Sequence, residues 1–82
     1  MTTEQRRDAV IAGLCAGTLP REQPLRVWGG VGTDVKCALC GDQTRPRDVE
    51  YEIEFASGAS VTFHDQCYAI WNEERDLSLI HI

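Results

Sequence analysis

The feature that most constrains this chain is a set of four metal-binding side chains arranged in two pairs. Cys37 and Cys40 form the first pair, His64 and Cys67 form the second, and residues 41–63 lie between them. Each pair is separated by two residues, a spacing that brings both side chains within reach of one ion. Three thiolates and one imidazole complete the tetrahedral shell of Zn²⁺ and leave no position for a water. The pattern predicts one structural zinc and no catalytic residue.

The length of the chain makes such a metal site useful. The protein has 82 residues, which predicts a single domain spanning residues 1–82. A hydrophobic core of this size supplies only about 3–5 kcal/mol of net stability. A structural zinc can add roughly 10–16 kcal/mol of apparent binding energy, which appears as folding energy. We therefore expect removal of zinc to unfold much of the protein.

The state of the cysteines depends on the compartment. Residues 1–8 are polar, and no apolar run approaches the ~18 residues of a membrane helix. We therefore expect a cytoplasmic protein without a membrane span, where thiols stay reduced and bind metal rather than forming disulfides. The alternative is an oxidised chain in which the four cysteines form two disulfides, in any of three pairings.

Charge is divided unevenly along the chain. Residues 1–47 hold seven Lys or Arg against five Asp or Glu, whereas residues 48–82 hold one Arg against eight Asp or Glu. This acidic balance disfavours non-specific nucleic-acid binding, which needs a cationic surface. An arginine patch in the first half would still permit it. The candidate residues are Arg6, Arg7, Arg21, Arg26, Arg45 and Arg47.

The first 20 residues predict an N-terminal helix over residues 3–16. Thr2 and Gln5 have the spacing of a capping box, and Gly17 and Pro20 favour the end of the helix. An apolar face of Val10, Ile11 and Leu14 is expected to pack on the zinc module or on another chain. Cys15 lies beside this face, which predicts a buried thiol.

Residues 21–36 are predicted to be a glycine-rich loop with at most one short strand, at residues 25–28. The glycines of residues 29–32 do not match a phosphate-binding loop, because neither required glycine motif is complete and a metal knuckle follows instead of a helix. Trp28 is predicted to fill the core beneath this loop.

Residues 37–76 are predicted to form the zinc module. Residues 49–55 and 60–63 alternate between apolar and polar side chains and should pair as a hairpin. The row formed by Glu50, Glu52 and Glu54 is expected to be the wet face of a strand, with an acidic docking surface as the alternative. Asp65 should cap a helix over residues 66–76, leaving an apolar tail at residues 77–82.

The order of knuckle, hairpin and helix resembles the treble-clef zinc finger. The Phe-His-x-x-Cys run at residues 63–67 is similar to the first zinc module of a LIM domain, although Ile70 stands where a LIM domain has its next cysteine. The runs at residues 26–30 and 63–71 are also similar to small uncharacterised bacterial zinc-binding proteins. These resemblances imply a small α+β fold, a treble-clef-like module preceded by a helix.

Two alternatives concern the ligands. A redox-active Cys-x-x-Cys at residues 37–40 is disfavoured because that motif belongs to a βαβ unit, which this pattern lacks. Cys15 would replace His64 as fourth ligand only if the first helix folded over the knuckle. His81 is expected to have no catalytic or metal-binding role.

The expected function is a zinc-stabilised, non-enzymatic protein-interaction or regulatory module with a protein partner. A closed ligand shell argues against an enzyme, since a catalytic zinc keeps an open position. The alternative function is nucleic-acid binding through the arginines of the first half.

Overall fold

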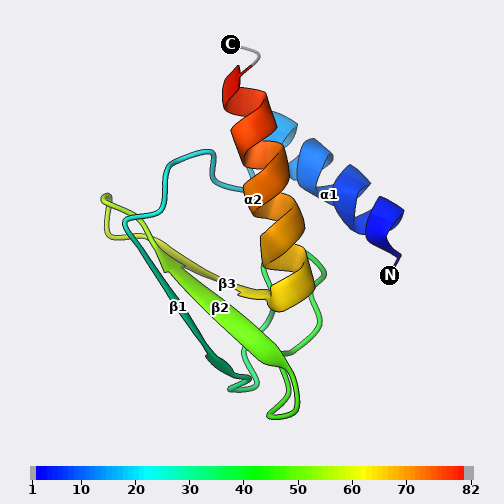
Figure 1. The fold of residues 1–82 in the computed structure, drawn as a ribbon, viewed down its shortest axis with the longest axis vertical. Helices are drawn as coiled ribbons and strands as arrows, with labels where there is room; N and C mark the ends of the chain where they lie inside the picture. Colours follow the sequence, from blue (N-terminus) through cyan, green and yellow to red (C-terminus); the bar gives the residue numbers. More distant parts are fainter. Residues whose placement is uncertain (1, 81–82) are drawn as a thin grey trace.

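The computed structural model describes residues 2–80, with side chains through residue 76. The order of elements is α1 (Thr3–Ala16), β1 (Arg26–Val31), β2 (Val49–Glu54), β3 (Ser60–His64) and α2 (Asp65–Ile80). The three strands form one antiparallel sheet, α2 lies across one end of it, and α1 packs beside α2 (Figure 1). The predicted small α+β fold is confirmed at this level. None of the described helices is long and apolar enough to cross a membrane.

Helix α1 begins with the predicted capping box. The Thr2 hydroxyl accepts a hydrogen bond from Gln5 N at 3.1 Å, and Gln5 Oε1 accepts one from Thr2 N at 2.8 Å. These two bonds satisfy backbone donors that the first turn leaves without a partner. Val10 and Leu14 are buried on the inner face, as predicted, but the prediction for Ile11 was wrong, because it is 44% exposed. The prediction for Cys15 was wrong, because its thiol is exposed.

Strand β1 overlaps and lengthens the short strand predicted at residues 25–28 within the loop at residues 21–36. Residues 26–31 pair with β2 along their whole length, with Arg26 opposite Glu54 and Val31 opposite Val49. The glycines within it do not interrupt the strand. A Cβ at Gly29 would lie 2.9 Å from the Tyr51 ring, so glycine is needed there for close packing. The composition of this segment suggested a loop because it says nothing about the strand available beside it.

The predicted hairpin of β2 and β3 is confirmed, with Tyr51 opposite Phe63 and Ile53 opposite Val61. The expected wet face of β2 is wrong at Glu50, which is only 8% exposed. Its carboxylate accepts hydrogen bonds from Thr33 N at 2.6 Å, from Thr33 Oγ1 at 2.8 Å and from Thr44 Oγ1 at 3.2 Å. Alternation along one strand could not reveal that a loop folds over its end.

The core lies between the sheet and the helices, around Trp71 of α2. The Trp71 ring lies 5.2 Å from the Phe63 ring and 6.2 Å from the Phe55 ring, and its Nε1 donates to Pro20 O at 3.0 Å. Trp71 thus occupies the place predicted for Trp28, which is 45% exposed on β1. Trp71 lies on the apolar face of helix α2 and is buried, whereas Trp28 lies on the edge strand β1 and is partly exposed.

Helix α2 extends beyond its predicted end. The helix was predicted over residues 66–76, but it begins at Asp65 and continues to Ile80. Residues 77–80 of the predicted apolar tail are therefore helical, and residues 81–82, with His81, lie outside the described residues. The guanidinium of Arg75 lies over the Trp71 ring, 5.0 Å from its centre. Arg75 therefore covers this part of the core.

Candidate metal centre

The first ligand pair lies at the tip of a narrow loop between β1 and β2. Lys36 pairs with Gln43 as an isolated bridge, and Cys37 N donates to Asp42 O at 2.9 Å. Gly41 has a φ of 79°, a conformation that side chains disfavour, and its N–H donates to Cys37 O at 3.0 Å. The chain therefore turns back immediately after the second cysteine, which brings both sulfurs to one side.

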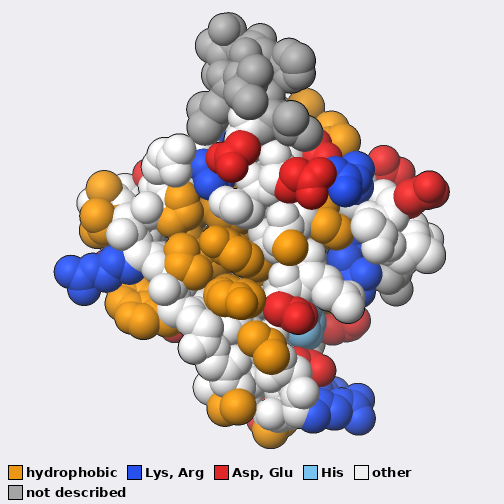
Figure 2. Space-filling view, in the orientation of Figure 1, with side chains coloured by type: hydrophobic (Ala, Val, Ile, Leu, Met, Phe, Trp, Pro, Cys, Tyr) orange, Lys and Arg blue, Asp and Glu red, His pale blue; other side chains and the backbone are white. Residues whose placement is uncertain are grey.

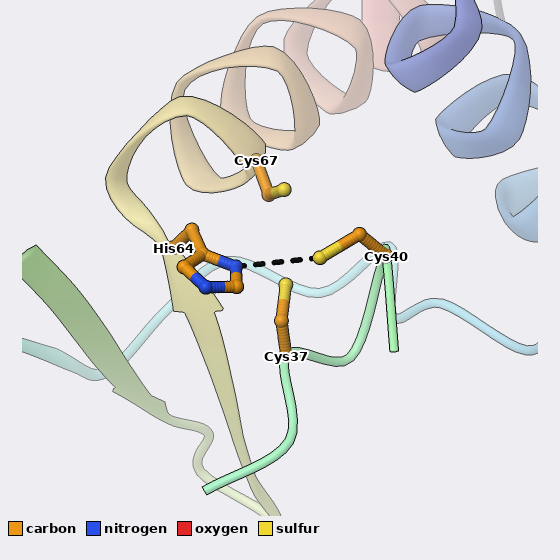
Figure 3. Close-up of side chains that lie close together, drawn as sticks. All are labelled: Cys37, Cys40, His64 and Cys67. Carbon is orange, nitrogen blue, oxygen red and sulfur yellow. Dashed lines mark hydrogen bonds between the residues drawn. The ribbon is translucent and has the colours of Figure 1, made fainter. Parts of the chain in front are cut away.

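The knuckle is placed against the sheet by its own backbone. Ala38 N donates to Thr62 O of β3 at 2.8 Å. His64 ends the same strand, and Cys67 lies in the first turn of α2, which follows without a loop. A β3–α2 junction without intervening residues leaves His64 and Cys67 little freedom to move apart. Figure 3 shows the four side chains of the two pairs pointing toward one another.

The four predicted ligands lie together as a cluster. Their ligand atoms are all within 4.8 Å of one another, and Cys40 Sγ lies 3.3 Å from His64 Nδ1. With Zn–S bonds of about 2.3 Å, tetrahedral geometry places two sulfurs about 3.8 Å apart. A small contraction would therefore suffice for one ion. These residues could hold a metal, consistent with a single zinc, and Cys15 is not among them.

Burial divides the ligands into two kinds. Cys37 and Cys67 are 3% and 1% exposed, whereas Cys40 and His64 are partly exposed. A depression of about 390 Å³ opens on Cys40 and His64, with Arg6 and Asp48 also on its wall. Solvent can therefore reach Cys40 and His64 but not the two buried sulfurs.

The thiols perturb one another strongly. A hydrogen bond from the Cys67 thiol, helped by nearby backbone N–H groups, lowers the pKa of Cys37 to about 4. The same contact, together with burial, raises the pKa of Cys67, and burial raises the pKa of Cys40. Three thiols at this separation cannot all ionise without a cation to balance them. The donor set therefore fits a divalent metal, which would stabilise all three thiolates.

Sequence reasoning missed Asp48, which lies behind His64. The Asp48 Oδ2 atom is 3.7 Å from His64 Nε2, on the side of the ring opposite Cys40. The carboxylate also accepts a hydrogen bond from Arg45 N at 2.9 Å, which holds it in place. A proton on Nε2, facing Asp48, leaves Nδ1 available for a metal. Asp48 shows no motif spacing, because the loop conformation alone brings it to the histidine.

Arg6 is the second contribution that sequence reasoning missed. The guanidinium of Arg6, from α1, acts on the Cys67 thiol to lower its pKa, against the larger opposing effects of Cys37 and burial. Three thiolates around Zn²⁺ leave one net negative charge, which a guanidinium beside the sulfurs offsets. Helix α1 therefore contributes a charge to the centre without contributing a ligand.

No known protein family, curated protein or solved structure matches this chain. The resemblance to treble-clef and LIM modules therefore stays a prediction from motif and element order. What is shown is the four-residue cluster itself and the α+β frame that holds it.

Proposed function

We propose that this protein is a zinc-stabilised, non-enzymatic protein-interaction or regulatory module. Cys37, Cys40, His64 and Cys67 would bind one structural Zn²⁺. The observation that supports this proposal is the convergence of all four ligand atoms within 4.8 Å. Bound zinc would supply structural cross-linking, because four protein ligands leave no position for a substrate or a reactive water.

The cross-link would act where the knuckle meets the sheet and the start of α2. The knuckle contacts β3 through the bond from Ala38 N to Thr62 O. Zinc would join this knuckle to the end of β3 and to the start of α2, so that metal binding stabilises three segments at once. This order of knuckle, hairpin and helix supports a treble-clef-like arrangement as part of the same proposal.

An interaction role is supported by the surface rather than by the metal. Several large apolar side chains of the described residues are exposed, among them Leu25, Trp28 and Val31. Such side chains on a small protein favour contact with another macromolecule. We place this role in the cytoplasm, where reduced cysteines would keep the centre loaded.

The zinc proposal is tested by native mass spectrometry of metal-replete protein, with and without a chelator. We expect one zinc per chain in the wild type and in the matched control Cys15→Ser, and none in Cys67→Ser. Chelation should remove the zinc together with the compact charge states. A metal-free mass lowered by the hydrogens of two disulfides would overturn the proposal.

The interaction role needs a separate test, because zinc binding alone does not establish it. Zinc-loaded wild type and chelated protein are used as baits in matched captures from lysate. We expect specific partners with the zinc-loaded bait that are lost on chelation. Absence of specific partners from both baits would count against an interaction module and leave the zinc result intact.

Nucleic-acid binding is the second candidate, supported by Arg45 and Arg47. Both are exposed, and together with Pro46 they line a depression near the metal centre. Arg7 contributes less to such a surface, since it pairs with Glu73 at 3.0 Å and also with Glu74. Nucleic-acid binding should weaken steeply as salt is added. Absence of a gel shift at low salt would eliminate this candidate.

A further inference from the structure

The outer edge of β1 is an open edge of the sheet. The strand order β1-β2-β3 leaves β1 at one edge of the sheet, while the knuckle contacts the other edge at Thr62. Edge strands usually carry protective charges, prolines or bulges. Among its residues, β1 has one charge, at Arg26, and no proline.

Exposed apolar side chains concentrate around this edge. Seven large hydrophobic residues are exposed among the described residues, and all but Ile11 lie on β1, close to it in sequence or opposite it on β2. They are Leu25, Val27, Trp28, Val31, Val35 and Val49. In Figure 2, hydrophobic side chains gather over the middle, left and lower parts of the molecule, where the sheet, including β1, lies in Figure 1. The open backbone edge and the apolar surface therefore coincide.

Gly30 has no explanation within the single chain. A Cβ placed on it would meet nothing within 4 Å, and its φ is not positive. Glycine within a strand costs roughly 0.5–1 kcal/mol relative to alanine. Gly29 differs, because the Tyr51 ring occupies the space of its missing side chain. A bare position at Gly30 suggests that something outside the chain uses that space.

Alternate residues of β1 direct their N–H and C=O groups toward β2 and away from it, which determines how another strand can pair with β1. The bond from Gly32 N to Asp48 O, at 2.9 Å, indicates that even-numbered residues of β1 bond to β2. The N–H and C=O groups of Val27, Gly29 and Val31 therefore point away from β2. A second antiparallel strand must form its hydrogen bonds with these three residues.

We propose that a second copy of this chain pairs with β1 through the same strand, antiparallel and centred on Gly29. In this register Gly29 faces the Gly29 of the second copy, and Val27 faces its Val31. Trp28 then lies opposite the second copy's Gly30, on the other face of the sheet. The indole of each copy occupies the space that Gly30 leaves, and two three-stranded sheets become one sheet of six strands.

Charge complementarity favours a second copy over an unrelated peptide. In this register Arg26 of each copy lies opposite Gly32 of the other, two positions from the exposed Asp34. Within its own chain, Arg26 reaches only a distant contact with Glu54, at 4.0 Å, and its side chain is 66% exposed. The two-fold axis repeats the Arg26–Asp34 approach at both ends of the seam. One surface is therefore complementary to itself, as a symmetric dimer interface requires.

The first test measures mass against concentration for zinc-loaded protein, by analytical ultracentrifugation. A seam of one strand pair is small, so we expect a reversible dimer in the micromolar range. Val31→Lys should shift the protein to monomer, because the substitution places a charge opposite Val27 of the other copy. Ile11→Lys, an exposed apolar residue on α1, is the matched control and should leave the dimer unchanged.

A second variant tests the register and cannot be confused with misfolding. Gly30→Val should raise the melting temperature of the monomer, since a β-branched residue suits a strand and its Cβ has free space. The same valine should raise the dimer dissociation constant about tenfold or more, because it meets the indole of the second copy. Stabilised folding with weakened dimerisation is an outcome that a damaged fold does not produce.

Three results would overturn the proposal. They are a wild type that stays monomeric at all concentrations, a dimer that survives Val31→Lys, and a dimer unaffected by Gly30→Val. A monomeric protein that captures another protein through β1 would assign the edge to a different partner. The proposed zinc site is judged separately, by metal stoichiometry in the same samples, so failure of one proposal leaves the other standing.

Discussion

The metal end and the β1 edge of this small sheet are organised in opposite ways. At the metal end, Cys37 and Cys67 are buried, and the ligand atoms converge within 4.8 Å. At the β1 edge, Val31 is 70% exposed and Gly30 has empty space beside it. The residues at the metal end converge within the chain, whereas the apolar side chains at the β1 edge are exposed to solvent. The proposed structural centre and the proposed dimer edge therefore use different parts of the same small fold.

Removal of zinc should produce the largest effect of these tests. It should unfold the metal end, so that this end is no longer better ordered than the β1 edge. We expect a loss approaching roughly 10–16 kcal/mol of apparent binding energy, enough to unfold the knuckle and the start of α2. Amide chemical-shift dispersion in the presence of a chelator measures this directly. Retention of native dispersion by the chelated protein would mean that the core alone holds the fold.

The two tryptophans offer the next largest contrast. Trp71→Ala should lower the free energy of unfolding by about 3–5 kcal/mol, because the buried indole contacts Phe63 and Phe55. Trp28→Ala should change monomer stability by less than about 1 kcal/mol, since Trp28 is 45% exposed. Denaturant unfolding at low protein concentration gives both values. Equal losses would show that the β1 edge contributes to the core after all.

Two glutamates of β2 allow a buried and an exposed carboxylate to be compared within one strand. Glu50→Ala should cost about 1–3 kcal/mol, because the N–H and the hydroxyl of Thr33 lose their acceptor. Glu52→Ala, at an exposed position on the same face, should stay within about 0.5 kcal/mol. Thermal unfolding of the two zinc-loaded variants provides the measurement. A neutral Glu50→Ala would contradict a structural role for this carboxylate.

Substitution of Asp48 should have the smallest effect on folding, because it would act only by weakening zinc binding. Asp48→Asn should weaken zinc affinity about 10- to 100-fold, because the carboxylate near His64 Nε2 orients the ring and strengthens it as a ligand. Competition with a chromophoric chelator measures the affinity. Asp42→Asn, which is exposed nearby and contacts Cys37 through its backbone carbonyl, is the matched control. Equal affinities for the two variants would remove Asp48 from the centre.

Local sequence patterns predicted several parts of this molecule. The spacing of the two ligand pairs identified the residues that converge, although it did not establish the metal. The capping box at Thr2 and Gln5, the alternation of β2 and β3 and the apolar face of α2 are likewise seen in the structure. Each of these features depends on residues close together in the chain, where backbone geometry links spacing to direction.

Tertiary structure alone decided the remaining features. The short strand predicted at residues 25–28 continues through the glycines to residue 31 because β2 lies beside it. Glu50 became buried because the loop carrying Thr33 and Thr44 folds over it. Asp48 reached His64 through the path of that same loop. The sequence by itself determined which residues can cap, chelate or alternate, since those properties are local. Which strand lies at the edge, and which carboxylate meets a histidine, depends on contacts between distant segments, and no local pattern records these contacts.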